Sequence, residues 1–238
     1  MRVDGMRMLV TGAAGGIGAA IADGFVDAGH EAFRHDLVGG AGIDVVGDIL
    51  DPRTLEAVAA FVADRSIDCV VAAHGIIRSG ALRETDAATV DLVMRVNTLA
   101  VIELHDAVAG SLNDREGAFL AVSSQAGLLG EPQNGIYSAS KAALIGWAQA
   151  IAADPATRHR LRVLCPGMTE TPLLIAAFRG VGEATGVGYD AVVAERLAGV
   201  PAGRLARPAE IARGARWLAE YRGSAYQLLS VNGGEVLA

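Results

Sequence analysis

A tyrosine and a lysine four residues apart are the first side chains in this sequence whose types and spacing could do chemistry. They are Tyr137 and Lys141, and Lys141 is the only lysine among 20 basic residues. On a helix, positions i and i+4 lie on one face, one turn apart. Because the chain otherwise uses arginine for positive charge, the single lysine suggests a need for a compact point charge. The alternative is an ordinary lysine on the surface of an amphipathic helix.

This pair could move a proton to or from a substrate oxygen. A phenol can do so when its pKa falls from about 10 toward the working pH. An ammonium about 4 Å away contributes about 4 kcal/mol at an effective dielectric near 20, or roughly three pKa units before the opposing cost of burial. Hydride transfer from an alcohol carbon releases one proton, so the pair suits that reaction.

A glycine-rich turn between a strand and a helix could bind a phosphate group. The apolar run Met6 to Val10 predicts a buried strand, and helical spacing begins at Ile17. Gly12 and Gly16 lie between that strand and the helix, and Gly18 lies in the first turn of the helix. Glycines let the backbone approach a pyrophosphate, and the helix N-terminus faces its negative charge. An ordinary tight turn is the alternative.

The acidic residue at the end of the second predicted strand could select the cofactor. This strand is Glu31 to Asp36. A carboxylate there can accept hydrogen bonds from a ribose 2′-hydroxyl and repels a 2′-phosphate, so Asp36 predicts NAD. Arg34 shares the strand face of Asp36 and could meet a phosphate instead, which leaves NADP as the alternative. A solvated loop aspartate is the other interpretation of Asp36.

The rest of the chain alternates between strand and helix patterns. Further strands are expected at 43–46, 68–73, 119–122, 162–165 and 226–231, and helices at about 52–65, 86–108, 135–153 and from Pro208. This alternation predicts an α/β fold in which one domain, 1–238, holds a doubly wound parallel sheet with helices on both faces. The segment 172–200 mixes apolar residues with glycines, and we expect a mobile apolar flap over the substrate there, not a core element.

Composition excludes several classes of protein. The formal net charge is -7 and no basic tract occurs, so we expect no nucleic-acid partner. No apolar run approaches the roughly 20 residues that span a bilayer, and Met1 to Gly5 has no signal-peptide character, so a cytoplasmic protein is expected. Cys69 and Cys165 lie in apolar runs and should be core residues. The histidines show no metal-ligand spacing, and no metal is expected.

Together these residues resemble the short-chain dehydrogenase/reductase family over nearly the whole chain, with its Rossmann fold. The run Thr11-Gly12-x-x-x-Gly16-Ile17-Gly18 resembles its cofactor loop, and Tyr137-x-x-x-Lys141 its catalytic pair. Other matching positions are Asn97 and Ser124 for the family's catalytic asparagine and serine, Asp48-Ile49 for its adenine contact, and Pro166-Gly167 with Thr169 and Thr171 for its nicotinamide carboxamide contact.

The resemblance implies a role for each catalytic residue. Ser124 would hydrogen-bond the substrate oxygen and stabilise developing charge. Lys141 would also hold the nicotinamide ribose, and Asn97 would support a water that links Lys141 to solvent. The resemblance further implies a homotetramer. The small residues Ala139, Ala143, Gly146 and Ala150 on one helix face would let two helices approach closely.

Two departures from the family pattern stand out. The family usually has Asn-Asn-Ala-Gly after its fourth strand, and here the residues are Ala72-Ala73-His74-Gly75. With the asparagine lost, another group must tie down this strand end, and His74 either faces the cofactor or is an ordinary loop residue. The run from Arg162 to Pro166 is also about two residues shorter than is usual in the family. The alignment of Thr169 and Thr171 with the family's carboxamide contact therefore depends on a short segment.

We therefore predict an oxidoreductase that transfers a hydride between NAD(H) and a secondary alcohol or ketone. The leucine, isoleucine and phenylalanine side chains of the segment 172–200 favour a small to medium, largely apolar substrate. One alternative is a ketoacyl-thioester reductase that uses NADPH. Another is a catalytically silent nucleotide sensor on the same fold, against which the intact Ser124, Tyr137 and Lys141 argue.

Overall fold

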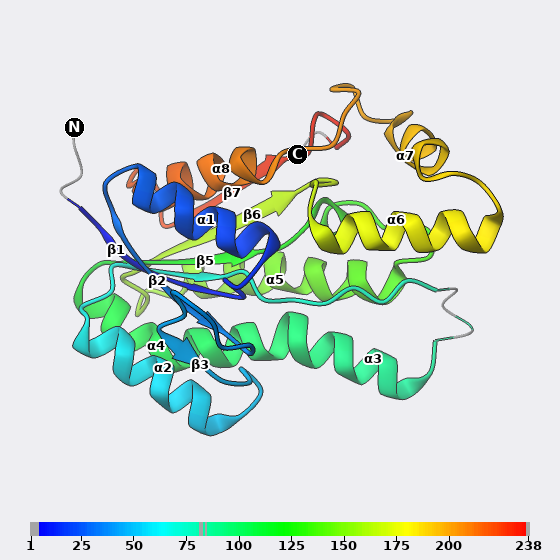
Figure 1. Cartoon of the computed structure of the whole chain (residues 1–238). Helices are drawn as coiled ribbons and strands as arrows, with labels where there is room; N and C mark the ends of the chain where they lie inside the picture. Colours follow the sequence, from blue (N-terminus) through cyan, green and yellow to red (C-terminus); the bar gives the residue numbers. More distant parts are fainter. Residues whose placement is uncertain (1–4, 81–82, 84, 237–238) are drawn as a thin grey trace.

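The computed structural model describes residues 5–80, 83 and 85–236, and in this part the chain forms a seven-stranded sheet covered by helices on both faces (Figure 1). The strand order is β3-β2-β1-β4-β5-β6-β7, and neighbouring strands pair in parallel. This is the predicted doubly wound α/β architecture, and that prediction is confirmed. Residues 1–4, which carry most of the expectation about the N-terminus, lie outside the described residues.

The elements agree with the predicted positions within a few residues over most of the chain. The strands are β1 (Arg7–Thr11), β2 (Glu31–Asp36), β3 (Val45–Val46), β4 (Cys69–Ala72), β5 (Ala118–Val122), β6 (Arg160–Pro166) and β7 (Tyr226–Val231). The α-helices are α1 (Gly16–Asp27), α2 (Pro52–Asp64), α3 (Ala87–Met94), α4 (Ala100–Asp114), α5 (Gly135–Ala153), α6 (Pro172–Thr185), α7 (Tyr189–Leu197) and α8 (Pro208–Glu220). A π-helical turn, η2 (Arg95–Leu99), joins α3 to α4, and a 3₁₀ turn, η3 (Gln125–Gly127), follows β5.

The central strands are buried on both faces because each face has its own layer of helices. Successive residues of a strand point to opposite faces. Val70 therefore packs with α2, α4 and α5, whereas Val71 packs with α1 and α8. Both faces are apolar, which explains the near-continuous hydrophobic runs of β4 and β5. Cys69 and Cys165 are free and buried in these two cores, as predicted.

Helix α2 begins where its capping residues predict. The side chain of Asp51 accepts a hydrogen bond from the backbone N–H of Arg53 at 2.9 Å, and Pro52 occupies the first helical position. None of the helices in the described part of the chain is long and apolar enough to cross a membrane.

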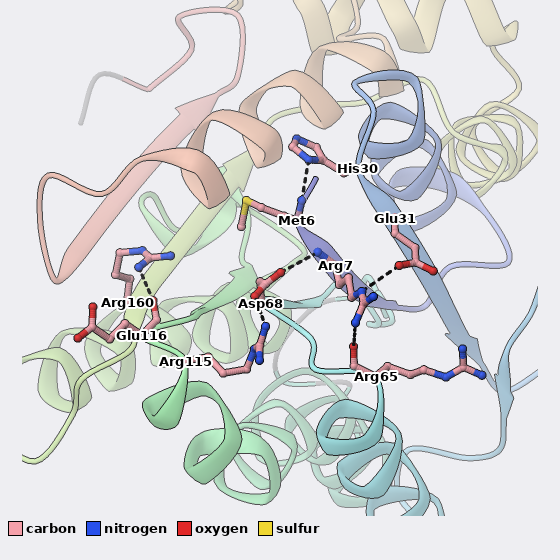
Figure 2. Close-up of polar contacts among 9 residues, drawn as sticks. All are labelled: Met6, Arg7, His30, Glu31, Arg65, Asp68, Arg115, Glu116 and Arg160. Atoms are coloured by element: carbon pink, nitrogen blue, oxygen red, sulfur yellow. Dashed lines mark hydrogen bonds and ion pairs between the residues drawn. The ribbon is translucent and has the colours of Figure 1, made fainter. Parts of the chain in front are cut away.

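A set of ion pairs closes the amino-terminal edge of the sheet (Figure 2). Asp68 is at its centre: one carboxylate oxygen accepts from the backbone N–H of Arg7 and the other from the guanidinium of Arg115, both at 2.9 Å. Arg7 also pairs with Glu31 and donates to the carbonyl of Arg65. The charged groups at this edge are engaged with one another, so the carboxyl ends of the strands are left as the place for chemistry.

The segment 172–200 differs from its prediction, because it forms two helices, α6 and α7, beyond the carboxyl end of β6 (Figure 1). Phe178 and Val192 are buried, whereas Leu173 is 58% exposed. The segment lies at the periphery of the fold, as a covering element would. The sequence did not predict the helices because Gly180, Gly182 and Gly186 interrupt the apolar pattern.

Candidate active site

The predicted catalytic residues meet at the carboxyl ends of the central strands. Tyr137 and Lys141 lie on one face of α5, with the lysine nitrogen 6.0 Å from the centroid of the tyrosine ring. Ser124 lies two residues beyond the end of β5, and its hydroxyl is close enough to the phenol of Tyr137 to lower the pKa of that phenol. The structure thus brings together one proton carrier, one hydroxyl and one ammonium from separate parts of the chain.

The ammonium of Lys141 lies in a narrow polar space inside the protein. The side chain is buried, and Nζ donates to the carbonyl oxygen of Val122 at 2.9 Å. A Cβ atom placed on Gly75 would come within 3.3 Å of Nζ, a tight contact, so the glycine leaves room for the ammonium. Burial lowers the pKa of Lys141 to about 8. Lys141 is therefore not an ordinary surface lysine.

The buried side chain of Asn97 hydrogen-bonds the backbone of a neighbouring segment. Its Oδ1 accepts from the N–H of Ile76 and its Nδ2 donates to the carbonyl of the same residue, both at 2.8 Å. Nδ2 also lies 3.1 Å from the hydroxyl of Ser140 on α5. The π-helical turn η2 carries Asn97, and such turns are frequent at functional sites. Asn97 thus joins the segment after β4 to the helix of the catalytic pair.

The electrostatics of Tyr137 differ from the expectation. Burial raises the pKa of the phenol, the nearby hydroxyl of Ser124 lowers it, and the charge of Glu131 raises it. The predicted lowering by Lys141 is not found here, because the ammonium is turned toward the carbonyl of Val122. Lowering of the Tyr137 pKa therefore requires a rearrangement of Lys141 or a second positive charge near the phenol.

The glycine turn fits a dinucleotide phosphate. Gly12 and Gly16 have φ angles of +66° and +57°, and a Cβ on Gly18 would lie 2.1 Å from the carbonyl oxygen of Gly12. Gly15, at the N-cap of α1, makes no side-chain capping bond, and no atom lies within 4 Å of its Cβ position. The first N–H groups of α1 are therefore accessible to an anion.

Asp36 lies beside this turn, where a ribose would follow the phosphates. Its two carboxylate oxygens accept from the backbone N–H groups of Ala14 at 2.8 Å and Val38 at 3.2 Å. The guanidinium of Arg34 is paired with Asp23 in the second half of α1. The carboxylate of Asp36 is thus held at the glycine turn. The guanidinium of Arg34, by contrast, lies along α1 and away from the N-terminus of that helix.

The segment after β6 reaches the glycine turn through Thr171. This residue caps α6 by accepting from the N–H of Leu174 at 3.3 Å, and its methyl group lies 3.6 Å from a Cβ position on Gly16. The hydroxyl of Thr169 donates to the carbonyl of Gly167 at 2.8 Å. Pro166 ends β6, so the structure brings this predicted carboxamide segment to the same edge of the sheet as the catalytic pair.

Of the two residues in the predicted adenine contact, Asp48 is exposed and Ile49 is buried. The carboxylate of Asp48 accepts from the N–H of Leu50 at 2.9 Å and is exposed. The side chain of Ile49 is 7% exposed and packs in the core with α2. Asp48 is thus available to a ligand, whereas Ile49 could contribute mainly through its backbone. Ile17 packs against the core formed with α1 and α8.

His74 is buried and turned away from solvent. Its Nδ1 lies 2.7 Å from the hydroxyl of Thr11. Burial and the charge of Lys141 lower its pKa to about 3, so the ring is neutral at ordinary pH. His74 makes the strand-end contact for which the sequence offered no asparagine.

A polar wall beside the catalytic residues was missing from the sequence-based prediction. The amide nitrogen of Gln125 lies 3.2 Å from a carboxylate oxygen of Glu131 and 2.8 Å from one of Glu235. The amide of Asn134 donates to the other oxygen of Glu131 at 3.0 Å. Gln125 and Glu131 stand between Ser124 and Tyr137 in the sequence and could have been considered. Glu235 is far away in the sequence, and no local pattern marks it.

Comparisons with known proteins show what the chain is similar to. A family model described as short chain dehydrogenase matches residues 6–181. The chain is 31% identical to the 3-oxoacyl-acyl-carrier-protein reductase FabG of Vibrio cholerae, with 98% of each chain covered. It is 32% identical to L-fucose dehydrogenase of Mus musculus, covering 92% of this chain and 83% of the relative. A solved structure of a putative NAD(P) dependent gluconate 5-dehydrogenase from Beutenbergia cavernae with bound NADP has a TM-score of 0.84 and 29% identity, with 98% and 97% coverage.

Proposed function

The chain belongs to the short-chain dehydrogenase family, and we propose that it is an NAD-dependent oxidoreductase that interconverts a secondary alcohol and its ketone. The observation that carries this proposal is that Ser124, Tyr137 and the buried ammonium of Lys141 meet at the carboxyl ends of the central strands, with Lys141 Nζ 6.0 Å from the centroid of the Tyr137 ring. When bound, the nicotinamide supplies the hydride acceptor or donor. The protein's own task is to hold the substrate oxygen and to move its proton.

Each catalytic residue has a distinct part in that task. The hydroxyl of Ser124 donates to the substrate oxygen, and the phenol of Tyr137 takes its proton during oxidation or gives it during reduction. Lys141 binds the ribose, and its ammonium stabilises the phenolate once it turns from the carbonyl of Val122 toward the phenol. Asn97 fixes the backbone next to Gly75, against which the ammonium packs.

Asp36 supports NAD as the preferred cofactor. Its carboxylate is held at the glycine turn, where it accepts hydrogen bonds from ribose hydroxyls and repels a 2′-phosphate. Arg34, the cation that favoured NADP in the sequence, is occupied by Asp23.

The second candidate is an NADPH-dependent reductase of 3-oxoacyl thioesters, and the likeness to FabG over 98% of the chain favours it. A catalytically silent nucleotide sensor would bind NAD without turnover of any alcohol. We further propose that the protein acts as a cytoplasmic homotetramer on a small molecule.

Steady-state kinetics test the proposed function. Purified protein is assayed with NAD or NADP against a set of secondary alcohols, and with NADH or NADPH against acetoacetyl-CoA, with the Tyr137→Phe variant as the inactive control. We expect oxidation of an alcohol with NAD at a higher kcat/KM than with NADP. Efficient reduction of acetoacetyl-CoA with NADPH and weak use of NAD would instead establish the second candidate. Binding of NAD with no turnover of either class would establish the sensor.

A further inference from the structure

The wall formed by Gln125, Glu131 and Glu235 identifies the kind of substrate. We propose that the active site takes a polyhydroxylated molecule, a sugar or a sugar alcohol, and that these three residues bind the hydroxyl groups next to the reacting carbon. This inference rests on the proposed function, because it assigns the substrate class of the same site.

The wall borders the place where the substrate oxygen must lie. Gln125 directly follows Ser124 in the chain and opens the 3₁₀ turn η3. Glu131 is close enough to Tyr137 for its charge to raise the pKa of the phenol. Because Ser124 and Tyr137 both contact the substrate oxygen in the proposed reaction, we expect the wall to face the neighbouring part of the substrate.

The buried amide of Gln125 lacks one partner. Gln125 is 4% exposed, and its nitrogen donates to Glu131 and Glu235. Its Oε1 has no hydrogen-bond partner among the described residues. That oxygen lies beside Gly167, where a Cβ atom would come within 2.8 Å of it. A buried acceptor without a donor costs free energy, and a ligand hydroxyl near the carboxamide segment would supply the donor.

The wall offers acceptors and negative charge. A carboxylate can only accept hydrogen bonds, and Gln125 has already given both amide hydrogens to Glu131 and Glu235. A matching ligand therefore brings several donors on adjacent atoms, as the hydroxyl groups of a sugar do. Phosphate and carboxylate groups would be repelled, which disfavours thioesters of phosphate-bearing carriers at this wall.

The earlier expectation of a largely apolar substrate was based on the segment 172–200 alone. Leu174 and Ile175 in α6 are half-buried and can still cover one side of a ligand. A sugar has apolar C–H faces as well as hydroxyl edges, so it suits an apolar cover opposite a polar wall. A site built to hydrogen-bond hydroxyl groups discriminates strongly against analogues that lack them.

A substrate panel with matched members tests the inference. The polyols are glucose, galactose, fucose, sorbitol and mannitol. The comparison substrates are cyclohexanol, which has a single hydroxyl group, trans-2-aminocyclohexanol, which carries an ammonium, and acetoacetyl-CoA for the reverse reaction. All are measured at saturating NAD or NADH with the full-length protein. We expect the best polyol to exceed cyclohexanol in kcat/KM by at least about tenfold.

The outcomes separate this inference from the proposed function. If cyclohexanol or acetoacetyl-CoA is the best substrate, the polyol assignment is overturned while the oxidoreductase stands. A preference for the amino alcohol would mean that the wall binds a cation and would also overturn the assignment. No turnover of any compound, with NAD binding intact, would remove the proposed function itself.

Variants of the wall provide the second test. Glu235→Gln keeps the size of the side chain and removes its charge, and Glu235 is not among the groups that shift the pKa of Tyr137. We expect the KM for the best polyol to rise about tenfold, and the polyol-to-cyclohexanol ratio of kcat/KM to fall. Glu56→Gln, on the exposed surface of α2, is the matched control and should leave both values unchanged. An equal change for both substrates in Glu235→Gln would show a merely structural role and would overturn the assignment.

Discussion

The imidazole of His74 and the hydroxyl of Thr11 lie 2.7 Å apart, and their contact joins the ends of β4 and β1 beneath the glycine turn. A Cβ on Gly12 would come within 2.7 Å of the His74 Cα, so the turn rests directly on this residue. The strand end is therefore tied down by the third residue of Ala72-Ala73-His74-Gly75 in place of an asparagine.

This buried histidine should make the fold sensitive to acid. Its folded-state pKa of about 3 lies below the ordinary value of 6.5, so the unfolded chain binds more protons between these two values. Stability from this residue is present above pH 6.5 and is lost as the pH falls toward 3. His74→Asn can still bond Thr11 but does not titrate. Between pH 7 and pH 4.5 its free energy of unfolding should fall by about 3 kcal/mol less than that of the wild type. Urea unfolding at the two pH values measures this, and equal acid losses would contradict it.

Replacement of Lys141 should show whether activity depends only on a positive charge at this residue or also on the position of that charge. Lys141→Arg keeps a positive charge, but the guanidinium is too broad for the space between Gly75 and the carbonyl of Val122. We expect kcat to fall by about a hundredfold or more, since displacement of a catalytic group by about 1 Å has an effect of this order. NAD affinity, measured by fluorescence titration, should change far less. Activity within a few-fold of wild type would remove Lys141 from the mechanism.

The same lysine predicts a stability effect at high pH. Its folded-state pKa of about 8 lies below the ordinary 10.5, so wild-type stability rises between these values as the unfolded chain gives up its extra proton. Lys141→Met has no side-chain proton to lose, so its stability lacks this dependence on pH. From pH 7 to pH 10.5 the unfolding free energy of the wild type should therefore rise by about 3 kcal/mol relative to that of Lys141→Met. A constant difference over that range would show that the ammonium is not desolvated.

The carboxylate of Glu131 should set the pH at which Tyr137 works. Because its charge raises the pKa of the phenol, Glu131→Gln should lower that pKa. The rising limb of kcat against pH for alcohol oxidation should then move to lower pH by a few tenths of a unit or more. Glu56→Gln serves again as the control. A shift to higher pH, or no shift, would exclude direct coupling between Glu131 and the phenol.

The charge of Asp36 should decide between the two nicotinamide cofactors. Asp36→Asn keeps one acceptor oxygen, which can serve the N–H of Ala14 or that of Val38 but not both, and it no longer repels a 2′-phosphate. The ratio of kcat/KM for NADP to that for NAD should rise at least tenfold. Asp44→Asn, whose carboxylate accepts from the N–H of Arg34, is a nearby control that should not change the ratio. Wild-type protein that prefers NADP would refute the assignment.

Gly146 offers a test of the proposed homotetramer. It is exposed on α5, and no atom lies within 4 Å of a Cβ placed on it, so Gly146→Trp should leave the fold of the single chain intact. If two copies of α5 approach closely there, the indole will split the assembly. Light scattering of both proteins at micromolar concentration measures the mass. A wild-type monomer, or an unchanged mass in the variant, would contradict the proposed interface.

Local signals in the sequence were sufficient for most of the fold. Apolar runs predicted the strands because both faces of this sheet are covered, and Asp51-Pro52 marked the start of α2. The sequence could not show the helices α6 and α7, since the glycines within α6 and between the two helices hide the periodicity, and the exposed face of α6 carries apolar residues such as Leu173 and Val181.

For the site, motif spacing located the residues but not their contacts. Ser124, Tyr137 and Lys141 lie near one another in the structure, yet the direction of the Lys141 ammonium depends on the carbonyl of Val122, which no side-chain pattern reveals. The polar wall depends on Glu235, which meets Gln125 only through the pairing of β6 with β7 and the turn that follows β7. Contacts between distant segments of this kind require the fold.

The position of β1 in the middle of the sheet has a consequence for how the chain folds during synthesis. Met8 pairs with Ala32 on one side and with Cys69 on the other, so the first strand to be made gains its second neighbour only after about 60 further residues. Closing such long loops is slow, and parallel pairing depends on it. We expect β1 to remain open along one edge until β4 has left the ribosome, and this interval is when the nascent chain is most exposed to aggregation.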